Sequence, residues 1–163
     1  TLGFTLYYSL GASMSIRIAY FLGQNDKAEA LLAGKAGRNL LLLNATLSSM
    51  LFYFAGNVIV HLFTQDEAVI TASLALLLPL VVYQFADALQ ICYANALRAT
   101  QHVLPMTWSS AVAYLVVGMP AAYLMGFTLK GGVEGIFYSF AISLMVAALL
   151  FAFFYHRFMK AKY

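Results

Sequence analysis

Charged residues are scarce in this sequence, and that scarcity decides which class of protein it encodes. Only 9% of the 163 residues are Asp, Glu, Lys or Arg, while 63% are hydrophobic. An ordinary soluble domain carries about 25% charged residues, so this chain cannot present a polar surface to water on all sides. It is predicted to be a membrane protein. The net charge of +3 is small and divided among several loops, which argues against a nucleic-acid partner.

Cysteine and the motifs of catalysis are also lacking. Cys92 is the single cysteine, so an internal disulfide and a multi-cysteine metal site are both excluded. The three histidines have no metal-ligand spacing, and the sequence contains no HExxH, GxSxG or phosphate-binding glycine loop. We therefore predict no catalytic residues, no metal site and no cofactor, and the protein is not expected to be an enzyme.

An initiator methionine and a charged leader region are missing as well. The chain starts at Thr1, already inside an apolar segment, so its first residues do not read as a signal peptide. We expect the chain to be the C-terminal piece of a longer protein.

Long apolar runs are abundant, and they predict the fold. Crossing the hydrocarbon layer takes about 20 mostly apolar residues, and each crossing must be a helix so that the backbone satisfies its own hydrogen bonds. The fold class is therefore all-α, a polytopic membrane protein with five transmembrane helices and a cytoplasmic tail at 156–163. The expected spans are 2–23, 39–63, 68–98, 107–128 and 133–155.

Polar turns separate these runs and carry helix-capping signals. Asp26 and Glu29 have the spacing of an N-cap residue and its capping-box acid. Thr64 and Glu67 repeat that spacing, so Thr64 is expected to cap the third helix.

The basic residues predict the orientation in the membrane. When the C-terminal tail is placed in the cytoplasm, seven of the nine basic residues fall on the cytoplasmic side and only Lys130 falls on the opposite side, a strong positive-inside bias. This orientation suits a multi-pass protein of the bacterial inner (cytoplasmic) membrane. The seven cytoplasmic residues are Lys27, Lys35, Arg38, Arg98, Arg157, Lys160 and Lys162.

The first helix carries a stripe of small residues. Gly11, Ser15, Ala19 and Gly23 recur every four residues, a spacing that lets a second helix approach closely. The stripe is either a sliding surface in a moving bundle or a static packing surface. Arg17 lies near the cytoplasmic end of the same helix, where we expect it to snorkel toward the headgroups or to form a structural pair.

Asp87 is the most informative residue, because it lies in the middle of the third expected span. At about 100° per residue, Tyr83, Asp87, Gln90 and Ala94 share one helix face. An Asp at a helix centre costs about 2.5–3.5 kcal/mol on insertion scales, so it should face protein or water. A phenol, a carboxylate and an amide along one line indicate a cation or proton site. The alternative is a protonated Asp87 that bonds a neighbouring helix as structural glue.

Proline is rare, with three residues in all, and two of them are expected to perturb a helix. Pro105 suits the first turn of the fourth helix. Pro79 cannot donate a backbone hydrogen bond, which frees the carbonyl of Ala75 to act as a further ligand near the acid. Pro120 is expected to kink the fourth helix, and both Pro79 and Pro120 are candidates for packing or gating positions.

Four stretches in order resemble one family, the multidrug and toxic compound extrusion (MATE) transporters. They are SMSIRIAYFLGQNDKAEA (13–30), LFTQDEAV (62–69), LLLPLVVYQFADALQICYANALRATQHVLPM (76–106) and GMPAAYLMGFTLKGGVEGIFYS (118–139). The resemblance is to the eighth to twelfth helices. It implies a twelve-helix protein of two pseudo-symmetric six-helix lobes, in which Asp87 matches the acid of the tenth helix and Tyr83 the aromatic beside it.

The resemblance implies a secondary active exporter of cationic or amphipathic compounds that exchanges them for Na⁺ or H⁺ by alternating access. Its partners would be those substrates, the lipid bilayer, and the missing N-terminal lobe and seventh helix of the same protein. One alternative is a lipid-linked oligosaccharide flippase of the same superfamily, which is disfavoured because Arg17 is the sole Lys or Arg in the interior of a span. Another is a non-transporting membrane scaffold subunit.

Overall fold

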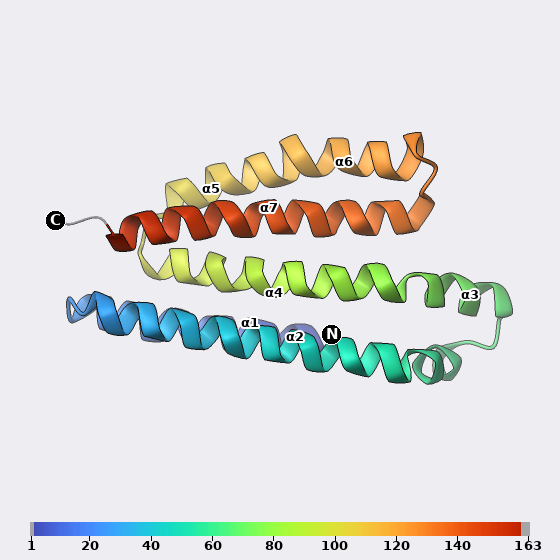
Figure 1. Cartoon of the computed structure of the whole chain (residues 1–163), viewed down its shortest axis with the longest axis horizontal. Helices are drawn as coiled ribbons and strands as arrows, with labels where there is room; N and C mark the ends of the chain where they lie inside the picture. Colours follow the sequence, from blue (N-terminus) through green and yellow to red (C-terminus); the bar gives the residue numbers. More distant parts are fainter. Residues whose placement is uncertain (1, 161–163) are drawn as a thin grey trace.

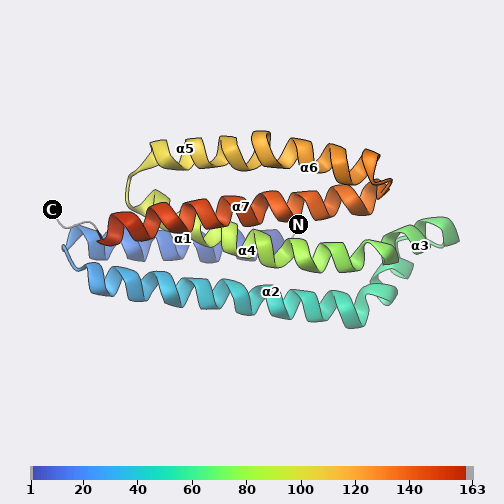
Figure 2. The same ribbon diagram turned by 45° about the horizontal axis from the view of Figure 1, so that its top comes forward.

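The computed structural model describes residues 2–160, with side chains from Thr5 onward, and all regular secondary structure in this part is helical. The helices lie side by side with their long axes nearly parallel (Figures 1 and 2). Their bounds are α1 Leu2–Gly23, α2 Lys27–Phe63, α3 Glu67–Ala75, α4 Leu77–Ala99, α5 Val103–Ala111, α6 Met119–Tyr123 and α7 Gly132–Lys160, with π-helical segments at Val112–Gly118 and Leu124–Thr128.

Four stretches of the described chain are long and apolar enough to cross a membrane. They are Lys27–Phe63, Leu77–Ala99, Val103–Thr128 and Gly132–Lys160, judged by length and composition. The prediction of an all-α, multi-pass membrane protein is confirmed. The first expected span does form a 22-residue helix, α1, but Arg17 and several serines and glycines make it less apolar, and it is not among these four.

Helix α4 is the centre of the bundle. It packs against α7 on one side and against α1 and α2 on the other, while the arm from α5 to α6 packs mainly on α7 (Figure 1). These close approaches are possible because half of the buried residues of α4 are alanines. The core is completed by larger side chains with no exposure, including Ile18, Leu41, Leu97 and Phe151.

The turns confirm one capping prediction and correct the other. Asp26 caps α2 as expected, because its Oδ1 accepts a hydrogen bond from the Glu29 amide at 3.0 Å. The prediction that Thr64 caps the third helix is wrong. Thr64 still belongs to the end of α2, where its amide donates to the Val60 carbonyl and its backbone is extended. Asp66 caps α3 instead and accepts from the Ala68 amide at 2.9 Å.

The third expected helix, 68–98, is interrupted at Leu76. Pro79 has no amide hydrogen to donate to the Ala75 carbonyl, so the helical ladder fails there. The Leu76 amide bonds back to the Ser73 carbonyl at 3.2 Å, and α4 begins at the next residue. The perturbation expected from Pro79 is therefore present, and it lies about one turn before the proline itself.

Pro120 perturbs the fourth expected helix through wide turns. The Met119 amide bonds to the Tyr114 carbonyl, five residues back, and the Leu129 amide bonds to the Leu124 carbonyl in the same way. The wide turns lie on both sides of the short α6, which begins beside the proline.

Most of the described basic residues lie at one end of the bundle, and Lys130 lies in a turn at the other. The turns at 24–26 and 100–102 and the C-terminal end of α7 all lie at the first end, shown on the left of Figure 1, whereas the turns at 64–66 and 129–131 lie at the other. The charges of Lys35, Arg38 and Lys160 all act on His156. Lys162 lies outside the described residues.

Candidate functional site

Asp87 lies halfway along α4, in the helix that packs against most of the bundle. Its side chain is half-buried, although the residues before and after it on the helix, Ala86 and Ala88, are almost completely covered. A carboxylate at this depth is stable only when protein groups or water surround it. The fold therefore keeps Asp87 away from the best-packed face of α4.

Three tyrosines lie within electrostatic reach of the Asp87 carboxylate. Its charge acts on the phenols of Tyr7 in α1, Tyr83 one turn earlier in α4, and Tyr114 in the π-helical segment after α5. Gln90, one turn later in α4, faces the Tyr114 hydroxyl. The structure thus brings together Tyr83, Asp87 and Gln90 as predicted from their shared helix face, and it adds two phenols from other helices.

No hydrogen bond or ion pair to the Asp87 carboxylate is formed by any residue that the structure describes. An ionised carboxylate accepts several hydrogen bonds, and a buried one without partners is costly. Phenols and an amide are groups that can donate to a carboxylate or coordinate a small cation through oxygen. The cluster can therefore hold a proton or a hard cation at Asp87.

A cavity of about 460 Å³ lies beside Tyr83, between α4, α7 and the arm that runs from α5 to α6. Apart from the two phenols and the Ser143 hydroxyl, its walls are apolar or aromatic. Such a wall suits an amphipathic molecule, and the aromatic faces suit a cation. The residues lining the cavity are Tyr83, Tyr114, Gly118, Met119, Ala122, Phe140, Ser143 and Leu144.

The two proline-related positions lie apart from this cluster. Ala75 is the last residue of α3, twelve positions before Asp87, which is about 18 Å along a helix axis. Its carbonyl is therefore too far from Asp87 to be a ligand of the same ion. Pro79 is buried, whereas Pro120 is exposed at the outer side of the arm.

The small-residue stripe of α1 has two parts. Gly11 is buried against α4, and Ser15 is half-buried. Ala19 and Gly23 are exposed, and no atom lies within 4 Å of a β-carbon built on Gly23. Arg17 is also exposed, as expected for a snorkelling side chain.

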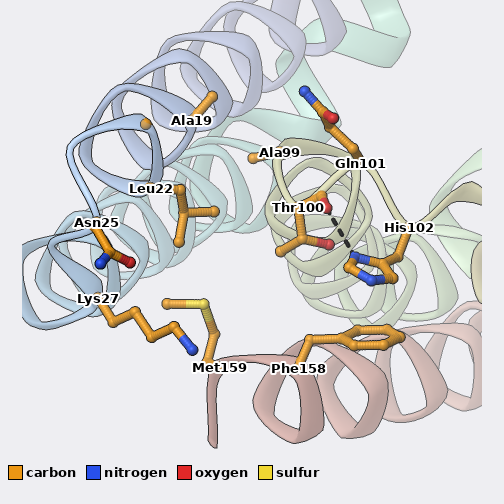
Figure 3. Close-up of a pocket in the computed structure, with 11 residues that line it drawn as sticks. Ala19, Leu22, Asn25, Lys27, Ala99, Thr100, Gln101, His102, Phe158 and Met159 are labelled. Carbon is orange, nitrogen blue, oxygen red and sulfur yellow. Dashed lines mark hydrogen bonds between the residues drawn. The ribbon is translucent and has the colours of Figure 1, made fainter. Parts of the chain in front are cut away.

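A second cavity, of about 390 Å³, opens at the basic end of the bundle (Figure 3). The exposed end of the α1 stripe forms one wall through Ala19 and Gly23, and the turn after α4 forms another. The His102 ring stacks on Phe158 at 3.8 Å between centroids, and its Nδ1 lies 2.7 Å from the Thr100 carbonyl. This cavity lies far from Asp87, at the end of the helices.

Tyr7 and Tyr114 are site residues that sequence reasoning missed, and Gln84 is a further polar residue of α4 with a partner in another helix. Gln84 accepts a hydrogen bond from the Ser49 hydroxyl of α2 at 3.0 Å. Tyr7 belongs to a helix face with Gly11, Met14 and Ile18, which are all buried. That 3.6-residue periodicity was visible in the sequence, but nothing in it pointed toward α4.

Residues 1–124 match the family described as MatE. The chain belongs to the MatE family. It is 30% identical over 154 residues to the multidrug resistance protein NorM of Vibrio vulnificus strain YJ016, an alignment that covers 92% of this chain and 34% of that protein. It is similarly 31% identical over 147 residues to the probable multidrug resistance protein NorM of Acinetobacter baylyi, which covers 90% of this chain and 33% of that protein.

This MatE chain spans about a third of the length of the curated relatives that it matches. The NorM of Vibrio cholerae serotype O1 matches to the same extent, with 30% identity over 155 residues. The resemblance drawn from the four sequence stretches is thereby confirmed at the level of the family. The MatE proteins are membrane transporters and not enzymes.

Proposed function

We propose that this chain is the C-terminal part of a multidrug exporter, which exchanges cationic or amphipathic compounds for Na⁺ or H⁺ and reaches both membrane faces by alternating access. In this proposal α1, α2, α4, the α5-to-α6 arm and α7 correspond to the eighth to twelfth helices of a twelve-helix transporter. The missing N-terminal lobe and seventh helix are its partners. Its site is the bacterial inner membrane, with the C-terminus in the cytoplasm.

The observation that carries the proposal is the setting of Asp87. A half-buried carboxylate in mid-span, within electrostatic reach of three phenols and without a bonded partner among the described residues, is poised to take up and release an ion. The structural-glue alternative needs a hydrogen bond from Asp87 to a neighbouring helix, and the described residues form none.

Transport follows if ion binding at Asp87 shifts the equilibrium between two arrangements of the lobe. Binding of Na⁺ or H⁺ neutralises Asp87, and the ion shifts the equilibrium only as far as its affinity differs between the two arrangements. The cavity beside Tyr83 supplies an apolar and aromatic wall for the substrate. The flippase alternative is less well supported, because the walls of this cavity contain no basic residue that would hold a pyrophosphate group.

The test is Asp87→Asn in the full-length gene product, with membrane insertion and dye efflux measured together. We expect normal insertion and loss of ion-driven efflux. The matched control is Asp66→Asn, which makes the same chemical change at the end of the bundle, where Asn still serves as a helix cap. Efflux driven separately by a Na⁺ gradient and by a pH gradient identifies the ion. Unchanged efflux in a correctly inserted Asp87→Asn protein overturns the proposal.

A further inference from the structure

Tyr7 is buried, with 4% of its surface exposed, yet its hydroxyl forms no hydrogen bond of ordinary geometry with any described residue. Buried hydroxyl groups nearly always have a partner. A buried hydroxyl of this kind can change its partner between two states of the protein without losing a well-formed bond.

The register between α1 and α4 places Tyr7 beside Asp87. The two helices run in the same direction (Figure 1). Gly11 packs against Ile91 and Asn95, and the Cys92 sulfur lies 3.9 Å from the Met14 sulfur. Tyr7 lies one turn before Gly11 in α1, and Asp87 lies one turn before Ile91 in α4. The two residues therefore occupy the same level of the bundle. The charge of Asp87 acts on the Tyr7 phenol, in agreement with this register.

Helix α2 supplies polar groups near Tyr7. The Ser48 side chain lies next to the Tyr7 hydroxyl. One turn earlier in α2, the Asn44 side-chain nitrogen is buried and has no hydrogen-bond partner among the described residues. Tyr7 is therefore within reach of both the carboxylate of α4 and the Ser48 hydroxyl of α2.

We propose that Tyr7 is a positioning residue that alternates between Asp87 and Ser48 as the coupling ion leaves and returns. When Asp87 is empty, the Tyr7 hydroxyl donates a hydrogen bond to the carboxylate. When the ion is bound, the carboxylate no longer needs this donor, and the hydroxyl turns to the Ser48 oxygen. A phenol rotates its O–H bond without moving the backbone, so the exchange needs no repacking of α1. The inference rests on the proposed coupling role of Asp87.

Electrostatics favour this exchange. The titratable groups that face Asp87 are the phenols of Tyr7, Tyr83 and Tyr114, and none of the three is charged in its ordinary form. When no ion is bound, the negative charge of Asp87 is therefore stabilised only by the dipoles of these neutral groups. A hydrogen bond to an ionised group is roughly twice as strong as one between neutral groups, so Tyr7 stabilises the empty state more than the loaded one.

The experiment is Tyr7→Phe in the full-length gene product, reconstituted into liposomes, with efflux measured against the concentration of Na⁺ or H⁺. Because the empty state loses a hydrogen bond, the half-saturating ion concentration should fall about tenfold, and turnover should slow because the ion is released less readily. Tyr20→Phe on the exposed face of the same helix is the matched control and should change neither value. An unchanged half-saturating concentration in Tyr7→Phe overturns the inference.

A second variant separates this role from a merely structural one. Ser48→Ala removes the acceptor used in the loaded state, so the half-saturating concentration should rise, in the direction opposite to Tyr7→Phe. If Tyr7 and Ser48 had only a structural role, both variants would have lower thermal stability. Their half-saturating ion concentrations would be unchanged. If Tyr7→Phe folds poorly, a Ser48→Ala protein with unchanged ion dependence overturns the inference by itself. If Asp87→Asn loses coupling while both variants keep the wild-type ion dependence, the Tyr7 inference fails and the proposed function stands.

Discussion

The α-carbon of Gly11 lies directly against the side-chain amide of Asn95. A β-carbon built on Gly11 would lie 2.7 Å from Asn95 Nδ2 and 2.9 Å from Ile91 Cγ2. The amide is held in place, because Asn95 Nδ2 donates to the Ile91 carbonyl at 2.9 Å. Helices α1 and α4 therefore meet here with no side chain from α1 between them.

Gly11→Val should separate these helices. The added side chain has no free space, and overpacking of this kind costs about 1–3 kcal/mol. We expect a lower thermal unfolding temperature for the full-length gene product in detergent. Gly23→Val is the control and should leave the temperature unchanged, since nothing lies within 4 Å of that position. Equal stability of the two variants would contradict the packing of α1 on α4.

Gly118 and Ser143 offer a test of the contact between the arm and α7. A β-carbon on Gly118 would lie 2.6 Å from Ser143 Oγ but 3.3 Å from Ser143 Cβ. Gly118→Ala should therefore destabilise the protein by about 1–3 kcal/mol. Adding Ser143→Ala should recover part of the loss, because the clashing oxygen is removed. The measurement is a double-mutant cycle of thermal stability, and strictly additive effects would refute the contact.

The hydrogen bond from Ser49 to Gln84 joins α2 to α4 near the candidate site. Ser49→Ala should lower the free energy of unfolding by about 1 kcal/mol, because it removes this bond and leaves the Gln84 oxygen without its donor. Thr46→Ala is the matched control. Its hydroxyl is exposed and donates only to the Leu42 carbonyl of its own helix, so its loss should cost less. A larger effect for Thr46→Ala would contradict the prediction.

Pro79→Ala should repair the break between α3 and α4. The new amide can donate to the Ala75 carbonyl, so hydrogen–deuterium exchange of residues 76–80 should slow. Pro105→Ala is the control. Pro105 is the third residue of α5, where an amide has no acceptor within the helix, so exchange there should not slow. Unchanged exchange around residue 79 would mean that the break has another cause.

Much of the fold was predictable because local chemistry determines it. The apolar runs predict the membrane class, and the helix face shared by Tyr83, Asp87 and Gln90 predicts three members of the cluster. The Asp26 cap follows from residues three positions apart. Thr64 and Glu67 have the same spacing, but Thr64 ends the preceding helix α2 and therefore does not cap α3.

The rest of the site depends on contacts that no local pattern encodes. Tyr7 is eighty positions from Asp87 in the sequence, and the two are placed at one level by the contact of Gly11 with Asn95 and Ile91. Tyr114 reaches the cluster through the arm that packs on α7. The Ala75 carbonyl was expected near the acid because Pro79 frees it, but the rise of the helix places it about 18 Å away.

The break at Leu76 also sets how this protein accommodates its lipid environment. Helix α4 has 23 residues, about 35 Å of helix, enough alone to cross about 30 Å of hydrocarbon. Helix α3 adds nine residues to that length on the other side of the break. Bending at this joint offers the protein a way to match a thicker or thinner bilayer through α3, without a change in the packing of α4.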